Sequence, residues 1–355
     1  MKQKFKQLLA KRPRRKKPSD PTLEEAIHNI PRITNETVAE HREEVLSGAR
    51  KFIYPLQHSM HRVVVVSVGI FIVLFVSFVA YSLLALYRFD TTSTFMYRVT
   101  QVVPFPIAKA GPDFVAYENY LFELRHYMHY YQTQQQVDFS SDAGKEQLDA
   151  FREQALQSVV NDAYIKQLAR QYGVTVSDQE LQQQVNLLRS QNRLGGSDEV
   201  FEDVLREFWD WSIGDFERKL HQQMLAQKVV SALDTETHER AEQVLSELEA
   251  GGDFAALAEQ HSDDETTAQN GGDYGFPIER THRDLPPQVI DTLFNMQPGE
   301  VSGIVETPRG LDILQVKEVD GSSIRASHIF FAFKDIDEFI DPIREENTQR
   351  VFISQ

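Results

Sequence analysis

A run of 24 residues without a charged side chain, from Val63 to Leu86, restricts the fold of this chain more than any other feature. About 20 apolar residues suffice to cross the hydrocarbon core of a bilayer, and buried helices of soluble proteins are rarely this long and uniformly apolar. The run starts too late and is too long to be a cleavable signal peptide. The sequence therefore predicts a single transmembrane helix over residues 63–87.

Charge is distributed unevenly on the two sides of this helix. Residues 1–62 contain 14 Lys and Arg against 7 Asp and Glu, whereas the rest of the chain contains 23 against 46. The positive-inside rule then predicts a cytoplasmic N-terminus and extracytoplasmic C-terminal domains in the cell membrane. A net charge of -16 argues against nucleic acid as a partner. The chain has no cysteine, which excludes disulfides and thiolate metal ligands.

Residues 1–62 are expected to form a basic cytoplasmic tail that ends in an amphipathic helix next to the membrane. The first 18 residues carry nine Lys or Arg and no acid, a pattern typical of a topology signal in contact with anionic lipid. Thr34 or Asn35 can cap the helix that follows, and Arg50 and Lys51 near its end suit the helix dipole. Its apolar stripe fits a helix on the membrane surface, or alternatively a docking helix.

Residues 88–112 are expected to be an extended linker, because the three prolines and one glycine of VVPFPIAKAGP do not suit a helix interior. From 113 to 233, apolar and aromatic residues recur at helical spacing and predict an all-α domain. The aromatic stripe between Phe114 and Tyr131 is either covered by other elements or free to bind apolar peptide.

Residues 234–333 change character from helical to mixed. Two short helices and a glycine-rich turn, Asn270–Gly275, precede a helix and a series of strand-like segments. The turn is not a phosphate loop, because no Lys-Ser/Thr pair follows it. Asp320-Gly321 predicts a hairpin between the last two strands. Residues 334–355 are expected to be a C-terminal tail with a short amphipathic helix, although Pro342 disfavours one.

Two regions resemble known families. The run GGDFAALAEQHSDD, NGGDYGF and LPPQVIDTLFNMQPGEVSGIVETPRGLDILQVKEV resembles a parvulin-type peptidyl-prolyl isomerase domain over about 80 residues. The helices before it, in VNDAYIKQLARQYGVTVSDQELQQQV and WDWSIGDFERKLHQQMLAQKVV, resemble the N-terminal chaperone region of SurA. The layout is similar to that of the membrane-anchored foldases PpiD and PrsA. The fold class implied is α+β: an anchor, an all-α domain, and an antiparallel sheet with helices.

The order of the parvulin elements departs from the family. Parvulins usually begin with a strand that carries Ala-Ser-His-Ile, but here Ala326-Ser327-His328-Ile329 follows the last strand. The domain is therefore expected to be circularly permuted, with Ile324–Phe331 antiparallel to Leu311–Val319. The alternative is a second parvulin repeat that begins at Ile324 and is cut short.

The resemblance assigns seven residues to the site. The proline-binding cup would be formed by Leu285 and Val289 with Tyr274 at its edge. The polar positions that match the family are Asp264, Thr307, Asp312 and His328. The family needs no cofactor. His126 and His129 lie three residues apart but lack a third ligand at helical spacing, so no metal site is expected.

Two of these positions depart from the parvulin pattern. Asp312 stands where the family has a second histidine, and Val289 stands where it has a large aromatic residue. An Asp–His pair can still form a charge-assisted hydrogen bond, but the smaller cup would grip proline less well. Alternatively, His328 only ties two strands together.

The sequence thus predicts a membrane-anchored extracytoplasmic foldase with a prolyl isomerase domain of weak or no activity. Its expected partners are unfolded or nascent extracytoplasmic polypeptides, the lipid bilayer and the secretion machinery. A fully active isomerase and a non-catalytic membrane scaffold are the alternatives.

Overall fold

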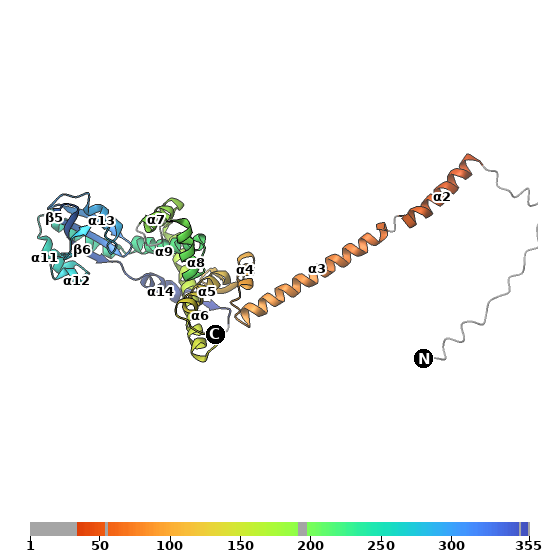
Figure 1. Ribbon diagram of the computed structural model, residues 1–355, viewed down its shortest axis with the longest axis horizontal. Helices are drawn as coiled ribbons and strands as arrows, with labels where there is room; N and C mark the ends of the chain where they lie inside the picture. The colour runs from red at the N-terminus through yellow and green to blue at the C-terminus, as the bar shows by residue number, and fades with distance from the viewer. Residues whose placement is uncertain (1–33, 54–55, 191–196, 348, 354–355) are drawn as a thin grey trace, which may run out of the picture. The chain divides into compact units, whose positions relative to one another are not determined.

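The computed structural model describes residues 34–53, 56–190, 197–347 and 349–353, which divide into two units between Val79 and Ala80. The expected basic tail, residues 1–33, lies outside the described residues. Helix α2 (Asn35–Ile53) begins after Thr34, whose hydroxyl accepts the N–H of Thr37, as the predicted cap requires. Helix α3 (Leu56–Tyr87) contains the one described segment long and apolar enough to cross a membrane, Val63–Tyr87 (Figure 1).

The second unit begins with a helical domain built on a large apolar core, with a smaller apolar cluster between two of its later helices. Its elements are α4 (Thr94–Val102), β1 (Pro106–Ala110), β2 (Asp113–Ala116), α5 (Tyr117–Gln134), α6 (Asp142–Tyr172), α7 (Asp178–Ser190), α8 (Asp198–Trp209) and α9 (Ile213–Leu233). The expectation that residues 88–112 are extended was wrong at α4. Ser93 caps this helix through the N–H of Met96, and the first proline comes only at Pro104, after the helix has ended.

The aromatic stripe of α5 is the centre of this core. Tyr117, Tyr120, Leu121 and Phe122 are buried, and Tyr127, Met128 and Tyr131 pack against them. The facing side chains come mainly from α6, with others from α4, β1 and the end of α3. Apart from Phe114, which is 66% exposed, the structure shows the covered alternative for the stripe, and the bundle itself supplies the cover.

The C-terminal segment returns to the helical domain. Helix α14 (Ile336–Glu346) lies beside α6 (Figure 1) and buries Ile340 completely in the helical core, with Ile336, Phe339 and Ile343 against it. Strand β7 (Arg350–Val351) pairs antiparallel with β1, which gives the sheet order β2-β1-β7. The predicted amphipathic helix thus forms despite Pro342.

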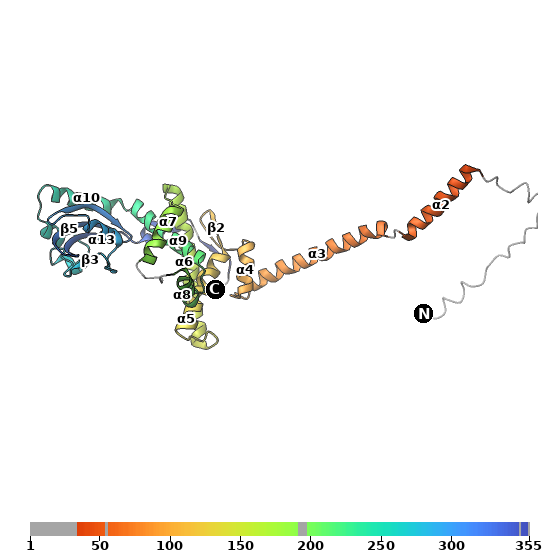
Figure 2. The same ribbon diagram turned by 45° about the horizontal axis from the view of Figure 1, so that its top comes forward.

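The other domain is a four-stranded antiparallel sheet with helices on both faces. It consists of α10 (Thr235–Glu249), α11 (Phe254–His261), α12 (Glu265–Ala268), β3 (Ile278–Glu279), α13 (Pro287–Leu293), β4 (Val301–Thr307), β5 (Gly310–Asp320) and β6 (Ser323–Ala332), in the strand order β3-β6-β5-β4. Helices α10 and α11 cover one face through Leu311, Ile313, Ile329 and Phe331 (Figure 2). Helix α13 covers the other through Leu314, Val316, Ile324 and Ala326.

Strand β6 occupies an inner position although it is last in the sequence of this domain. It pairs antiparallel with β5 over the predicted residues, with Leu311 opposite Phe331 and Val319 opposite Ile324, and a β-bulge between Val316 and Glu318 takes up one extra residue of β5. The permuted arrangement is therefore confirmed. Since side chains alternate along a strand, Asp312 and His328 share the face that α13 covers.

Candidate functional site

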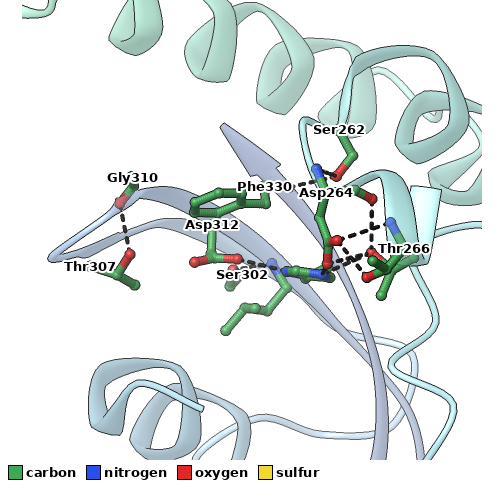
Figure 3. Close-up of polar contacts among 11 residues, drawn as sticks. Ser262, Asp264, Thr266, Ser302, Thr307, Gly310, Asp312 and Phe330 are labelled. Carbon is green, nitrogen blue, oxygen red and sulfur yellow. Dashed lines mark hydrogen bonds and ion pairs between the residues drawn. The ribbon is translucent and has the colours of Figure 1, made fainter. Parts of the chain in front are cut away.

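His328 lies at the centre of a polar network on this face of the sheet. Its Nδ1 is 2.8 Å from a carboxylate oxygen of Asp312, and its Nε2 is 3.0 Å from one of Asp264. Figure 3 shows the two carboxylates on opposite sides of the network. The side chain is only 8% exposed. A doubly protonated imidazole can donate to both carboxylates at once, so the geometry suits a charge-assisted pair of hydrogen bonds.

Asp264 is positioned by the start of α12. Its carboxylate caps this helix by accepting the N–H of Thr266 and the hydroxyls of Thr266 and Thr267. Burial raises the pKa of Asp264, but these hydrogen bonds and the nearby His328 outweigh it and hold the pKa below its usual value. The hydroxyl of Thr267 also lies 3.0 Å from Nε2 of His328. Sequence reasoning missed Thr267, because an Asp at an N-cap is a common signal but a Thr three residues after it is not.

The glycine-rich turn carries Tyr274 to the imidazole. The Tyr274 ring stacks on His328 with the ring centroids 4.3 Å apart, and burial raises the pKa of its hydroxyl. Gly272 accepts the N–H of His328, and Tyr274 donates its own N–H to Ala326. A Cβ on Gly272 would lie 2.2 Å from the carbonyl oxygen of His328, and its φ of +75° also favours glycine. The turn therefore needs glycine here to lie against β6.

A cavity of about 490 Å³ opens beside this network. All seven residues assigned from the sequence line it: Asp264, Tyr274, Leu285, Val289, Thr307, Asp312 and His328. The hydroxyl of Thr307 donates to the carbonyl of Gly310 in the β4–β5 turn. Among the described residues, Thr307 therefore forms its side-chain hydrogen bond within the turn and not with the imidazole of His328. Val289 is 1% exposed and belongs to the apolar cluster under the sheet, so it offers little surface to a ligand.

Two aromatic walls of the cavity were not predicted. Phe276 follows Tyr274 by two residues, and Phe330 follows His328 by two residues on β6. The two-residue period of a strand would have found Phe330, because it must share the face of His328. Phe276 lies in an irregular segment, where no such period applies.

Comparison with known proteins matches two domain families to this chain. The SurA-like N-terminal domain matches residues 56–230, and the PPIC-type PPIase domain matches residues 223–318. The chain carries a parvulin-type isomerase domain and a SurA-like domain. The second match ends before β6, so His328 is supplied by a strand beyond the matched range.

Individual relatives carry the names of foldases and chaperones. Foldase protein PrsA of Caldanaerobacter subterraneus is 30% identical, covering 48% of this chain and 58% of its own. Chaperone SurA of Albidiferax ferrireducens is 27% identical, covering 49% and 47%. Periplasmic chaperone PpiD of Escherichia coli is 32% identical, covering 26% and 14%. A solved PrsA structure from Bacillus anthracis aligns at 18% identity over 54% of this chain and 86% of that one, with a TM-score of 0.18. This chain spans about half the length of the first curated relatives that it matches.

The two histidines considered for metal have other contacts. His126 stacks on Trp211 at 4.7 Å, and burial lowers its pKa to about 4. Nε2 of His129 lies 2.8 Å from the carbonyl oxygen of Glu207. Within the described ranges, no group of three or more candidate ligands could hold a metal ion.

Proposed function

We propose that this protein is a membrane-anchored extracytoplasmic foldase that binds proline-containing segments of unfolded polypeptide and accelerates X-Pro isomerisation weakly. One observation carries the proposal: the cavity beside His328 joins the polar network to apolar and aromatic walls. The names of the relatives, foldase and chaperone, support the same reading.

Isomerisation of an X-Pro bond needs no covalent chemistry. The site must lower a rotation barrier of about 18–20 kcal/mol by binding the twisted amide better than the planar one. Leu285, Phe276 and Phe330 offer apolar surface to the proline ring. Tyr274 and the two carboxylates fix the His328 ring on the opposite wall, so the wall is rigid when the amide turns.

The rate is expected to be lower than that of parvulins with two histidines. Asp312 places a carboxylate where the family has the imidazole ring of a second histidine. One oxygen of this carboxylate already forms a hydrogen bond with His328. Val289 is almost fully buried and offers the proline ring less apolar surface than a large aromatic side chain would. Phe276 and Phe330 offset part of this loss, because aromatic side chains bury large apolar areas.

The decisive test measures isomerisation of a proline peptide by the full chain in lipid nanodiscs. Uncatalysed isomerisation takes about 10–100 s at 25 °C, so a weak acceleration is measurable. Leu285→Ala should abolish the acceleration, whereas Val319→Ala, at an exposed position of the β5–β6 hairpin, should not. No acceleration by the unchanged chain, or equal rates in the two variants, would contradict catalysis at this cavity and leave a binding role.

The membrane anchor is a separate part of the proposal. The exposed apolar helix Val63–Tyr87 and the basic excess before it support a cytoplasmic N-terminus. Protease added from outside to cells with a permeable outer wall should digest the chain beyond Asp90. Protection of the C-terminal domains would contradict the extracytoplasmic assignment.

A further inference from the structure

Helix α3 does not end in a linker but inside the helical domain. Ser82, Ala85 and Leu86 are buried, the last two within the helical core. The Tyr87 hydroxyl donates to the carbonyl of Pro106 at 2.6 Å, and the Tyr117 hydroxyl donates to that of Leu86 at 2.8 Å. The final turn of the apolar helix is therefore fixed to the folded domain by both packing and hydrogen bonds.

The length of the apolar run places this junction at the edge of the bilayer. About 20 residues cross the hydrocarbon core, and counted from Val63 they reach Ser82, the first residue of α3 that the domain buries. On the other side of the same turns, Tyr81 and Leu84 remain exposed. One side of these turns is therefore covered by protein, whereas the other side is apolar and open.

An apolar surface surrounds this junction. Phe89, two residues after the end of α3, is 69% exposed. Helix α4 starts a few residues later, and Figures 1 and 2 both show it beside the end of α3. Phe95 and Val102, seven residues apart on one face of α4, are 58% and 82% exposed, while Met96 and Val99 are buried. The helix thus has an inner face in the core and an outer apolar face beside the exit of α3.

The charge of this surface is opposite to that of the domains. Arg88 and Arg98 are both exposed within it, and neither has an ion-pair partner among the described residues. Arg98 lies between Phe95 and Val102 on the same face of α4. Acidic residues outnumber basic ones two to one in residues 63–355, so a surface with two unpaired arginines differs in charge from the rest of this part of the chain. Arginine beside aromatic and aliphatic side chains fits an interface with anionic headgroups.

We propose that this exit face (Tyr81, Leu84, Arg88, Phe89, Phe95, Arg98 and Val102) docks into the headgroup region of the bilayer. The proposal rests on the membrane anchor proposed above. Continuity with the membrane-crossing helix selects lipid over a polypeptide client or a second copy of the chain as the occupant. The docked face would hold the helical domain flat on the membrane, so the anchor would not act as a flexible tether.

Because the chain lacks cysteine, single-cysteine labelling tests this directly. The full chain is reconstituted in vesicles of phosphatidylcholine and phosphatidylglycerol that contain lipid with a quencher near the headgroup or, in a second set of vesicles, near the end of the acyl chain, which reaches the middle of the span. An environment-sensitive fluorophore is placed at Phe95→Cys or Val102→Cys, with Val73→Cys as the membrane-span control and Val319→Cys as the solvent control. We expect lipid-borne quenching at 95 and 102 and none at 319.

The controls separate the outcomes. Quenching at 73 but not at 95 or 102 would overturn the docked face and leave the anchor standing. No quenching at 73 would overturn both. Labels at 95 and 102 that are shielded from aqueous iodide but not quenched by lipid would show a protein occupant and also overturn the proposal. Arg98→Glu should reduce quenching at 102 when phosphatidylglycerol is present, and much less in phosphatidylcholine alone.

Discussion

Gly272→Ala is the substitution that the site geometry constrains most tightly. The added Cβ would lie 2.2 Å from the carbonyl oxygen of His328, far inside van der Waals contact. The backbone of the turn must then move away from β6, and the hydrogen bond from the His328 N–H to the Gly272 carbonyl must lengthen or break. Because Tyr274 is two residues further along the same turn, its ring should leave the imidazole.

The magnitude has two parts. A non-glycine residue at positive φ costs about 1–2 kcal/mol, and forcing a methyl group into a packed site costs about 1–3 kcal/mol more. Gly275→Ala is the matched control, because φ is +79° there but nothing lies within 4 Å of the added Cβ. We therefore expect a loss of about 2–5 kcal/mol for Gly272→Ala and about 1–2 kcal/mol for Gly275→Ala.

Hydrogen exchange of the full chain measures the loss where it occurs. The free energy of local opening at the β6 amides, including that of His328, should fall more in Gly272→Ala than in Gly275→Ala, and isomerisation should slow in the same order. Equal protection of β6 in the two variants would refute the close approach of the turn to the strand. Full isomerase activity in Gly272→Ala would refute the role given to the Tyr274–His328 stack.

Three further outcomes are expected. Asp312→Ala leaves the buried Nδ1–H of His328 without its acceptor and should destabilise the sheet domain by about 1–3 kcal/mol. Asp312→Asn keeps an acceptor oxygen and should destabilise the domain less, and chemical denaturation of the two variants measures the difference. Because the folded pKa of Asp264 is depressed, its stabilising effect is fully present above its unfolded pKa of about 3.9 and is lost as pH falls through the lower folded value. Asp264→Asn should remove that part of the pH dependence of unfolding, and an unchanged acid limb would contradict it. Ile340→Ala should destabilise the helical domain by about 2–5 kcal/mol in thermal unfolding, against less than about 0.5 kcal/mol for the exposed Val200→Ala; equal effects would place α14 outside the core.

The hairpin made the pairing of the two site strands predictable. Asp320 pairs with Ser323 across the two-residue turn Gly321-Ser322, as expected for a hairpin at this point of the sequence. A β-bulge between Val316 and Glu318 then shifts the register by one residue and places Leu314, instead of Gln315, opposite His328. Asp312, two residues along β5, then has to share a face with His328. The antiparallel pairing could be predicted from this one segment, but the shared face of Asp312 and His328 depends on the bulge, which the sequence did not indicate.

Tertiary contacts decided what the sequence did not show. Phe114–Ala116 reads as the start of a helix, but β1 pairs with these residues and makes them strand β2. Pro342 disfavours a helix, yet α14 forms because its apolar face is buried in the core of another domain. The partner of β2 is the neighbouring strand β1, across Gly111-Pro112, whereas the partners of α14 lie far away in the sequence. Helix propensity takes account of neither contact.

The return of α14 changes what counts as a domain in this chain. The sheet domain is inserted between α9 and α14 of the helical domain, so the chain leaves the helical core near Leu233 and re-enters it near Asp335. Asp234 connects the two chain segments that join the domains. Its buried carboxylate caps α10 and also accepts the N–H of Lys334 at 2.9 Å. A fragment that stops at Leu233 would lack Ile340 and leave its site in the core open. The helical domain is therefore complete only with residues 334–353, and a chaperone assay on it must include them.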